Sequence, residues 1–263
     1  MDIPYWANVS NRVALVTGCG SPSGIGIAIA RALGQSGATV VITATSDRVH
    51  ERAKELTREG IDAHAVVADL GSFEAAQSVA RFAQDAAGPL SILISNAGMT
   101  SRGDVVESGT VTDIPVHEWH DGLRRNLDTA FFMSRALIPS MREQTFGRIV
   151  FVTSVTGPLM AMRGEAAYAA AKAGMVGLMR AIAIDEAPFG ITANAVAPGW
   201  INTGAQTDAE AIEGGLVPLA RSGEPAEVAA VVASLCFPGA AYVTGQLIAV
   251  DGGNSVGEER SGR

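Results

Sequence analysis

Short apolar runs alternate with amphipathic stretches along almost the whole chain. The short runs are rich in β-branched residues and are bounded by polar or glycine-containing segments, which predicts buried strands. We expect these strands at Arg12–Thr17, Thr39–Thr43, Ala63–Ala68, Leu90–Ser95, Arg148–Thr153, Ile191–Val196 and Gln246–Val250. The stretches between them have helical periodicity, and we expect helices at Ile25–Gln35, Asp47–Glu59, Ser72–Ala87, Val116–Arg142, Glu165–Ala187 and Pro225–Phe237.

Nearly continuous apolar strands joined by helices are typical of a parallel sheet that is covered on both faces. The pattern therefore predicts an α/β fold with one doubly wound, seven-stranded parallel sheet and right-handed crossovers. No internal repeat or linker interrupts the alternation, so we expect a single domain with its core at about residues 11–253. Residues 254–263 are expected to form a loose tail. Ligands of such folds bind outside the carboxyl ends of the strands, so informative residues should follow each strand.

Composition excludes several classes of protein. The chain has 263 residues, of which 48% are hydrophobic, and a formal net charge of −8. This charge argues against binding to nucleic acid or to an anionic membrane. Two cysteines, Cys19 and Cys236, make neither a disulfide framework nor a zinc motif, so no metal site is expected. The N-terminus lacks the features of a signal peptide and no unbroken apolar run is long enough to span a membrane, so we expect a cytoplasmic protein.

A glycine-rich loop, Gly18-Cys-Gly-Ser-Pro-Ser-Gly24-Ile-Gly26, follows the first predicted strand. Glycines allow the backbone to approach a pyrophosphate, and the start of the next helix offers free N–H groups and a partial positive charge. An ordinary strand-to-helix turn would have the same composition. The loop lacks the GK[ST] signature of phosphate-binding NTPases, and its position after the first strand favours dinucleotide binding.

Two weaker signals follow the third and fourth predicted strands. Asp69-Leu70 could place a carboxylate against an adenine amino group, or Asp69 could simply cap the helix that begins near Ser72. Asn96-Ala97-Gly98 could pack closely against a flat ligand, with Asn96 tying two strand ends together, or could be a plain turn. Both alternatives stay open from the residues alone.

Residues with catalytic chemistry gather around the fifth predicted strand. Ser154 closes this strand, and Tyr168 and Lys172 follow four residues apart, so that they share one face of a helix. A neighbouring ammonium and an oxidised nicotinamide would lower the pKa of a tyrosine, which could then exchange a proton near neutral pH. Asn126 lies among apolar neighbours and is either a satisfied core amide or an anchor for a chain of water molecules.

The order of these motifs resembles the short-chain dehydrogenases/reductases over about Val13 to Gly253. The matching residues are Gly18, Gly24, Gly26, Asp69, Asn96-Ala97-Gly98, Asn126, Ser154, Tyr168, Lys172, Pro198-Gly199, Thr203, Tyr242-Val-Thr-Gly and Asp251-Gly-Gly. The resemblance implies a Rossmann fold and an enzyme that transfers a hydride between NAD(P) and a carbonyl or alcohol.

The same resemblance implies a role for individual residues. Tyr168 would be the catalytic acid/base, Lys172 would lower its pKa and bind the nicotinamide ribose, Ser154 would position the carbonyl, and Asn126 would support a proton-relay water. The cofactor would be held by Gly18, Ser23, Gly24, Ile25, Gly26, Thr45, Ser46, Asp69, Leu70, Asn96, Ala97, Gly98, Tyr168, Lys172, Pro198, Gly199, Ile201 and Thr203.

Within this family the chain looks nearest to the 3-oxoacyl-thioester reductases. Of the basic pair with which those enzymes dock acyl carrier protein, Arg148 is present, but Phe189 stands at the second position. A carrier-protein partner is therefore doubtful, and a small apolar ketone or alcohol is the alternative substrate. A non-catalytic nucleotide-binding module would be expected to lack Ser154, Tyr168 or Lys172, all of which are present. A sugar-nucleotide epimerase would need a further C-terminal domain.

The residues at the end of the second predicted strand indicate which of the two nicotinamide cofactors is preferred. NAD-preferring enzymes place a carboxylate there, against the adenosine ribose. In this family's spacing the position is Ala44, followed by Thr45, Ser46, Asp47 and Arg48. Two hydroxyls and a guanidinium suit a 2′-phosphate, so we expect NADP(H) to be favoured over NAD(H). Asp47 as a ribose ligand is the competing interpretation.

The sequence also leads to expectations about the oligomeric state and about the entrance to the substrate site. By resemblance the chain forms a homotetramer through its two long helices, and Ala173, Gly174, Gly177 and Ala181 would allow close helix approach. The mouth is expected to be lined by Met99–Thr112, Met160, Met162 and Trp200–Leu216. Gly204, Gly214 and Gly215 could be hinges of a lid, or part of a merely flexible loop.

Overall fold

The computed structural model describes residues 4–98 and 109–257. Seven parallel strands form one sheet in the order β3-β2-β1-β4-β5-β6-β7. The strands are β1 (Val13–Thr17), β2 (Thr39–Ala44), β3 (Ala63–Val67), β4 (Leu90–Ser95), β5 (Gly147–Val152), β6 (Ile191–Pro198) and β7 (Leu247–Val250). The predicted doubly wound parallel sheet is confirmed.

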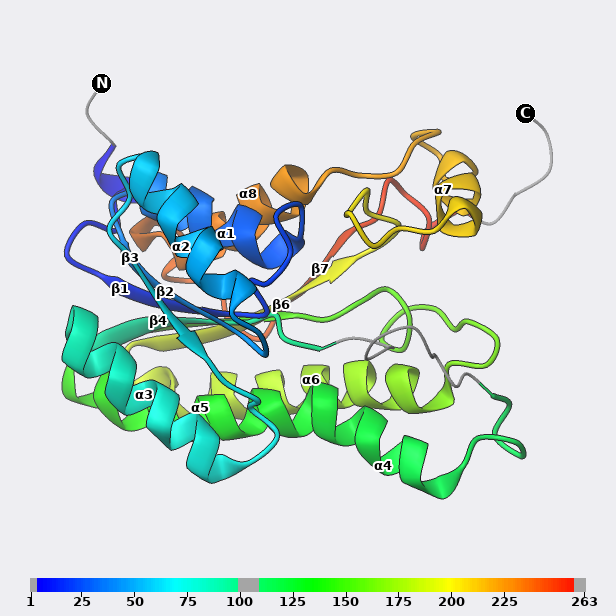
Figure 1. The fold of residues 1–263 in the computed structure, drawn as a ribbon, viewed down its shortest axis with the longest axis horizontal. Coiled ribbons are helices and arrows are strands. Elements are labelled where there is room, and N and C mark those ends of the chain that lie inside the picture. Colours follow the sequence, from blue (N-terminus) through cyan, green and yellow to red (C-terminus); the bar gives the residue numbers. More distant parts are fainter. Residues whose placement is uncertain (1–3, 99–108, 258–263) are drawn as a thin grey trace.

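Helices cover both faces of the sheet (Figure 1). One face carries α1 (Ile25–Gln35), α2 (Arg48–Arg58) and α8 (Pro225–Cys236). The opposite face carries α3 (Phe73–Ala87), α5 (Thr129–Glu143) and α6 (Ala166–Asp185), and α4 (Val116–Leu123) continues the line of α5 and packs on α6. The predicted helices are present with ends that differ by only a few residues, except that the predicted helix 116–142 is divided into α4 and α5.

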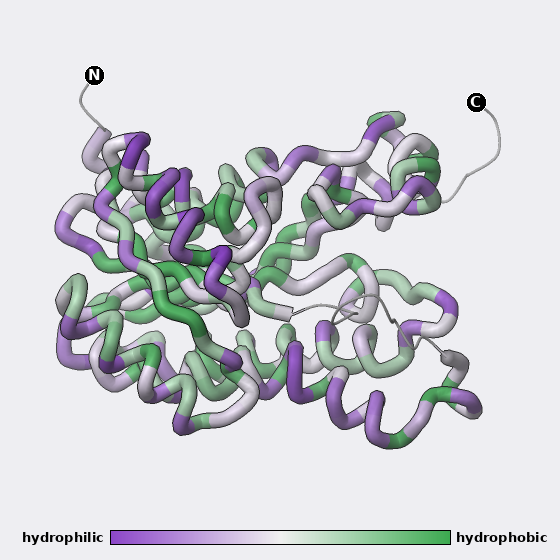
Figure 2. Tube along the Cα trace, in the orientation of Figure 1, coloured by the Kyte–Doolittle hydropathy of each residue, from purple (hydrophilic) through white to green (hydrophobic). Residues whose placement is uncertain are grey.

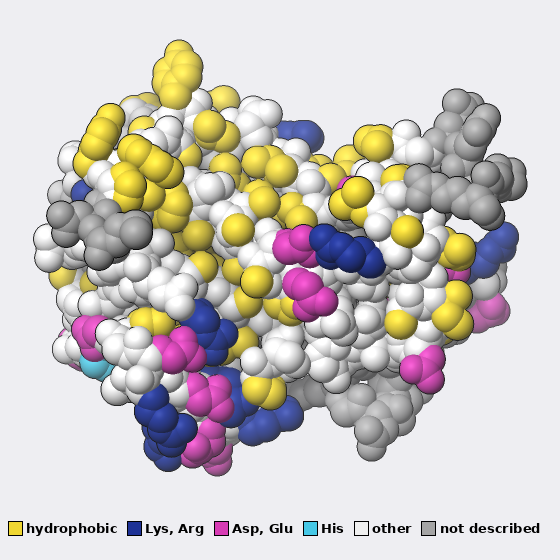
Figure 3. Space-filling model, turned by 90° about the horizontal axis from the view of Figure 1, so that it is seen from above, with side chains coloured by type: hydrophobic (Ala, Val, Ile, Leu, Met, Phe, Trp, Pro, Cys, Tyr) yellow, Lys and Arg dark blue, Asp and Glu magenta, His cyan; other side chains and the backbone are white. Residues whose placement is uncertain are grey.

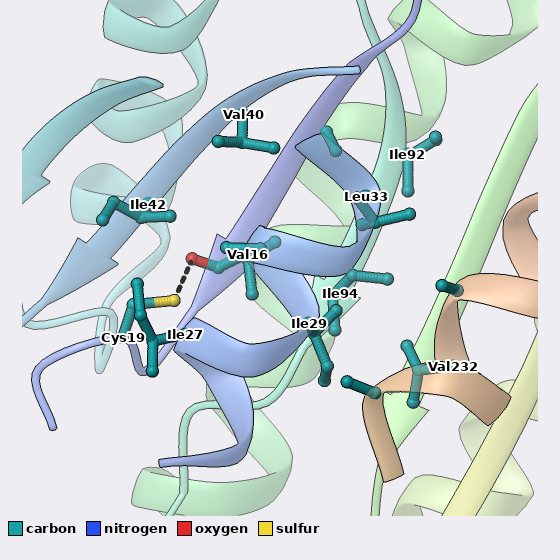
Figure 4. Close-up of a cluster of buried hydrophobic side chains, with 14 of the residues drawn as sticks. Val16, Cys19, Ile27, Ile29, Leu33, Val40, Ile42, Ile92, Ile94 and Val232 are labelled. Carbon is teal, nitrogen blue, oxygen red and sulfur yellow. Dashed lines mark hydrogen bonds between the residues drawn. The ribbon is translucent and has the colours of Figure 1, made fainter. Parts of the chain in front are cut away.

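Alternating side chains along the central strands build two cores. Ala14 and Val16 point toward α1 and α8, whereas Val13 and Leu15 point toward the face of α3, α5 and α6. This alternation follows from the two-residue period of a strand. Figure 4 shows the first core, where Val16 lies among branched side chains of α1, β2 and β4. In Figure 2 the sheet is the most hydrophobic part of the chain and the outer side of α2 is hydrophilic.

The surface of α2 is strongly charged, and its charges are mixed. Figure 3 shows basic and acidic side chains crowded together over this helix, at the lower left of that view. Lys54 pairs with Glu51 at 2.8 Å, and Arg52 pairs with Glu55. Because the signs alternate, this surface has no extended field of one sign.

Some parts of the chain differ from expectation. The predicted long helix 116–142 is interrupted by a π-helical turn (Arg124–Asp128) between α4 and α5. The predicted mouth segment Trp200–Leu216 contains a helix, α7 (Asp208–Gly215), so Gly214 and Gly215 are helical and are not loop hinges. Residues 254–257 were wrongly expected to be loose, because the Ser255 N–H donates to Asp251 Oδ2 at 2.7 Å and Gly257 N–H to Gly253 O at 3.2 Å.

Candidate active site

The predicted site residues gather at the carboxyl edge of the sheet. The chain leaves β1 for β2 on one side, and β4 then adds on the other side of β1. Such a reversal opens a crevice beyond the strand ends, where ligands bind in this class of fold. The glycine loop follows β1, Asn96-Ala97-Gly98 follows β4, Ser154 follows β5, and Pro198 ends β6.

Asn96 ties the ends of β1 and β4 together. Its Nδ2 donates to Thr17 O at 2.9 Å and to Gly18 O at 3.2 Å. In return, Thr17 Oγ1 accepts from the N–H groups of Asn96 at 3.0 Å and Ala97 at 2.8 Å. Asn96 therefore has the strand-tying role considered above, and it holds the two walls of the crevice at a set separation.

The glycine loop fits a pyrophosphate. Gly18 has a φ of +76°, a conformation that favours glycine. A Cβ on Gly26 would lie 2.7 Å from both Asn96 Nδ2 and Gly18 O, so only glycine is accommodated there. Gly24 precedes α1, which begins at Ile25 without a side-chain cap, and the N–H groups of its first turn can therefore receive an anion.

Three side chains meet at the ends of β5 and the start of α6. Ser154 lies close enough to Tyr168 to lower the pKa of its phenol, and Ser154 Oγ accepts from Thr156 N–H at 3.1 Å. Lys172 is 2% exposed and donates from Nζ to Val152 O at 3.2 Å. Its Nζ lies 5.5 Å from the centre of the Tyr168 ring. The helical spacing of four residues thus places the ammonium under the ring, as predicted.

Burial dominates the ionisation of both residues. It raises the pKa of Tyr168 above its ordinary value; Ser154 lowers this pKa, and the nearby carboxylates Glu165 and Glu210 raise it. It also lowers the pKa of Lys172 to about 8. In the protein alone, the cost of desolvating a phenolate sets the net direction of the Tyr168 pKa, and the lowering of this pKa by Lys172 stays a prediction.

Asn126 lies in the π-helical turn between α4 and α5. It is 1% exposed, and its Nδ2 donates to Gly122 O at 3.0 Å. A Cβ on Gly98 would collide with Asn126 Oδ1 and would lie 3.2 Å from Lys172 Nζ. Asn126, Gly98 and Lys172 therefore line one narrow space. π-Helical turns inside helices are frequent at functional sites.

Asp69 and Leu70 differ in their surroundings. Asp69 is exposed and accepts from Gly71 N–H at 3.0 Å, whereas the cap of α3 is Ser72, which accepts from Ala75 N–H at 3.2 Å. Capping of α3 therefore does not explain Asp69, whose side chain lies 3.9 Å from Arg124. Leu70 is 4% exposed and belongs to the core beneath α3.

Thr45, Ser46 and Arg48 lie together between β2 and α2. Arg48 Nε donates to Ser46 Oγ at 3.3 Å, and Thr45 is exposed. A Cβ on Gly20 would lie 3.3 Å from Ala44 Cβ, so this group adjoins the glycine loop. Asp47 is exposed and makes no side-chain cap on α2. Hydroxyl and guanidinium donors thus lie at the end of β2, close to the glycine loop.

The segment after β6 closes the other side of the crevice. Pro198 O accepts from Val155 N–H at 3.0 Å, and Gly199 N–H donates to Val250 O at 3.0 Å. Ile201 is 9% exposed, and its carbonyl accepts from Thr203 N–H. Beyond Thr203, Gly204 N–H donates to Ser23 Oγ at 2.9 Å. Ser23 therefore joins the glycine loop to the segment that carries α7.

The expected carrier-docking cation is not available at the surface. Arg148 is 4% exposed, its Nη1 donates to Gly147 O and Gly190 O, and its guanidinium lies 4.2 Å from the centre of the Phe146 ring. At the second position, Phe189 is 37% exposed and packs beneath Arg142. Neither expected position presents a free cation to a partner.

Glu165 was missed by the sequence analysis. It precedes α6 directly, three residues before Tyr168, and burial raises its pKa. Glu165 stands only three residues before Tyr168 in the sequence, so its nearness to the tyrosine along the chain was readable. The Thr207-x-x-Glu210 capping box could likewise have revealed α7.

Two other features of the described residues bear on function. Within residues 4–98 and 109–257, no three His, Cys, Asp or Glu side chains are grouped so as to hold a metal ion. Helix α6 is long and apolar enough to cross a membrane by length and composition alone. However, 44% of it is buried inside the molecule, where Ala171, Met175 and Met179 lie in the core, and core helices of soluble proteins pass the same test. Residues 99–108 of the predicted substrate mouth lie outside the described part of the chain.

Known proteins resemble this chain over nearly its full length. A family model described as enoyl-(acyl carrier protein) reductase matches residues 18–255. The 3-oxoacyl-[acyl-carrier-protein] reductase FabG of Pseudomonas aeruginosa is 38% identical over 252 residues, which are 94% of this chain and 98% of that protein.

Solved structures share the fold closely. A Beutenbergia cavernae protein, provisionally assigned as an NAD(P)-dependent gluconate 5-dehydrogenase and solved with NADP at low occupancy, is 35% identical with a TM-score of 0.85; the match covers 94% of this chain and 98% of that one. A 7α-hydroxysteroid dehydrogenase in complex with NADH and 7-oxo glycochenodeoxycholic acid is 28% identical with a TM-score of 0.88, over 98% of this chain and 100% of that one.

The glycine loop, the tyrosine–lysine pair and the strand order of this chain are consistent with its similarity to these proteins in sequence and in fold. The chain belongs to the short-chain dehydrogenase/reductase family and is an NAD(P)-dependent oxidoreductase acting on CH–OH and C=O groups.

Proposed function

We propose that this enzyme reduces a carbonyl to a hydroxyl with Tyr168 as the proton donor. The observation that carries the proposal is the position of the Lys172 ammonium, which is buried, bonded to Val152 O and 5.5 Å from the centre of the Tyr168 ring. The raised pKa of Tyr168 keeps the phenol protonated at neutral pH, which suits donation to a carbonyl oxygen.

Each side chain has a distinct part in this mechanism. The Ser154 and Tyr168 hydroxyls donate hydrogen bonds to the carbonyl oxygen, and the phenol proton passes to that oxygen as the C–O bond becomes single. Lys172 stabilises the phenolate that remains, and it would hydrogen-bond the nicotinamide ribose of a bound cofactor. Asn126 borders the same space as Lys172 and supports reprotonation through water. When bound, the reduced nicotinamide supplies the hydride that adds to the carbonyl carbon.

The cofactor would be held along the crevice. Gly18, Gly24 and Gly26 allow close approach of the pyrophosphate, with Ser23 and Ile25 at the start of α1. Asp69, Leu70 and Asn96-Ala97-Gly98 would border the adenosine and the adjoining ribose, and Pro198, Gly199, Ile201 and Thr203 the nicotinamide. We propose that NADP(H) is favoured, since Thr45, Ser46 and Arg48 offer donors to a 2′-phosphate.

The substrate is a small carbonyl compound, and a 3-oxoacyl thioester is the first candidate because of the likeness to the FabG reductase. The burial of Arg148 and the presence of Phe189 support a free substrate over one carried by acyl carrier protein. The alternative is a ketone or alcohol unrelated to fatty acids. We further propose that the enzyme is a homotetramer and that it works in the cytoplasm. Cys19 and Cys236 are buried and form no disulfide, which suits a reducing compartment.

An absorbance assay of nicotinamide oxidation tests the proposal. The purified protein is mixed with NADPH or NADH and with 3-oxoacyl-CoA, 3-oxoacyl carrier protein, and a panel of ketones. We expect turnover of at least one carbonyl compound, and loss of that turnover when Tyr168 is replaced by Phe. No turnover across a broad panel, or full turnover without the phenol, would contradict the proposed reaction.

A further inference from the structure

The segment that carries α7 forms a flap beside the crevice, which we define as residues 203–222. The base of the flap is closed by a bridge between Ile201 and Gly223, where Asn202 N–H donates to Gly223 O at 2.8 Å. Of the residues of α7, all of which the structure describes, only Gly214 is buried. A helix that buries so little surface is held weakly and opens at a low free-energy cost.

The glycine loop contacts the start of this flap. Gly204 N–H donates to Ser23 Oγ at 2.9 Å. A Cβ on Gly204 would lie 2.5 Å from the same oxygen, so any larger residue there would displace the Ser23 hydroxyl. On the other side of the crevice, Pro198 O at the end of β6 accepts from the N–H of Val155, the residue after Ser154, at 3.0 Å. The flap therefore starts between the glycine loop and the serine of the reaction centre.

The Ser23 hydroxyl can make one more hydrogen bond. A hydroxyl both donates and accepts, and Ser23 Oγ uses its acceptor side for Gly204 N–H. Among the residues that the structure describes, none accepts the Ser23 proton, and Ser23 is exposed. A phosphate oxygen at the glycine loop can accept this proton, and hydrogen bonds in series strengthen one another. One hydroxyl can thus join a bound diphosphate to the flap.

We propose that Ser23 is a positioning residue that links the cofactor diphosphate to Gly204, so that a cofactor bound at the glycine loop fixes the flap beside the substrate. The inference rests on the proposed placement of the cofactor. Ser23 acts on the substrate through the flap and does not touch it. The link would serve any carbonyl substrate of the proposed reaction, including a 3-oxoacyl thioester.

Hydrogen–deuterium exchange of peptides from the flap tests the link without turnover. Three probes at saturating concentration separate the parts of the cofactor: 2′-AMP has no diphosphate, ADP-ribose has the diphosphate but no nicotinamide, and NADPH has both. In the wild type, ADP-ribose and NADPH should slow exchange around Gly204, and 2′-AMP should not. Ser23→Ala should speed this exchange in the free protein by roughly two- to tenfold, as expected for one lost hydrogen bond, and should abolish the effect of ADP-ribose.

Two variants of the same loop are controls. Ser21 Oγ lies 3.9 Å from the position of a Cβ on Gly204, so Ser21→Ala should keep the effect of ADP-ribose on the flap. Ser23→Thr retains the hydroxyl and should restore it. If ADP-ribose slows exchange in residues 18–26 but not in the flap, or slows the flap equally in Ser23→Ala, the inference is wrong and the cofactor placement stands. If ADP-ribose protects neither segment, both are wrong.

Kinetics with saturating NADPH provide a reciprocal test. Ser23→Ala should raise the KM of the carbonyl substrate by roughly two- to tenfold and change kcat little, because the flap is loosened while the reacting groups stay in place. Gly204→Ala should raise KM similarly, since its Cβ displaces the Ser23 hydroxyl, and should add nothing in the Ser23→Ala background. Independent, additive effects of the two substitutions, or a fall in kcat at unchanged KM, would refute the inference.

Discussion

Tyr168 is a half-buried and Lys172 a buried ionisable group, and the chemistry of both depends on their position. We expect Tyr168→Phe to keep the fold and cofactor binding, because the ring still packs in place. Removing the phenol proton should lower kcat by roughly 10²–10⁴-fold, the usual share of general acid–base catalysis. Steady-state kinetics with the best substrate from the panel measures this. Retention of more than about a tenth of wild-type turnover would contradict the assignment.

We expect Lys172 to lower the stability of the cofactor-free protein. The fall of its pKa from 10.5 to about 8 corresponds to roughly 3 kcal/mol, of which about 1 is returned by its bond to Val152 O. Lys172→Met should therefore raise the free energy of unfolding by about 2 kcal/mol at pH 7, while activity is lost.

The sign of the pH dependence follows from linkage. Between pH 8 and 10.5 the unfolded chain holds a proton that the native Lys172 has released, so wild-type stability rises through this window and the advantage of Lys172→Met shrinks. Urea unfolding at pH 7 and pH 10 measures both. The control is Lys54→Met, at the other lysine of the chain, which is exposed. The effect of this substitution on the free energy of unfolding should not change with pH in this window.

At the scale of elements, the turn from β2 into α2 decides between the two cofactors. Ala44→Asp should shift preference toward NADH, because a carboxylate repels a 2′-phosphate and accepts hydrogen bonds from ribose hydroxyls. The measurement is kcat/KM for both cofactors at one substrate concentration, where the wild type should prefer NADPH by about tenfold or more. Equal or better use of NADH by the wild type, with a gain for NADPH in Asp47→Asn, would show that Asp47 governs the pocket.

The junction of β1, α1 and β4 depends on one glycine. Replacing a helical glycine by alanine usually stabilises by about 1 kcal/mol. Gly26→Ala should instead destabilise the protein and weaken cofactor binding, because its Cβ would press on the backbone of Gly18 and on Asn96. Thermal unfolding with and without NADPH measures both effects. Gly215→Ala in α7, where a Cβ meets open space, should be neutral or stabilising; if Gly26→Ala behaves the same way, the close packing described here is wrong.

At the scale of the whole molecule, one face of α6 is suited to assembly. Ala173, Gly177 and Ala181 are exposed at four-residue intervals, a Cβ on Gly177 would meet nothing, and Ile184 is 76% exposed beyond them. Isologous packing of this face on a second copy would bury it, and closed symmetry is the usual outcome. Light scattering should give about four times the 27.0 kDa chain mass. Gly177→Arg should reduce that mass, and a wild-type mass near 27 kDa would refute the tetramer.

The strands, the helices and the order of the motifs were determined by the sequence alone. Apolar periodicity is local, and turn residues such as Gly18 and Gly24 act on their own backbone, so no distant contact is needed to recognise them. The four-residue spacing of Tyr168 and Lys172 places them on one helical face for the same reason. The fold class therefore follows from short-range patterns, and the reaction type from the resemblance of the ordered motifs to the short-chain dehydrogenases/reductases.

Only the tertiary structure decided which charged groups are buried and which segments meet. Arg148 looked like a docking cation in the sequence, but strand packing leaves it 4% exposed. The direction of the Tyr168 pKa depends on desolvation and on Glu210, which comes from a distant helix. The contact between Ser23 and Gly204 joins residues 181 positions apart. Burial and long-range contacts are properties of the assembled fold, because they depend on which elements pack together, and no local pattern encodes them.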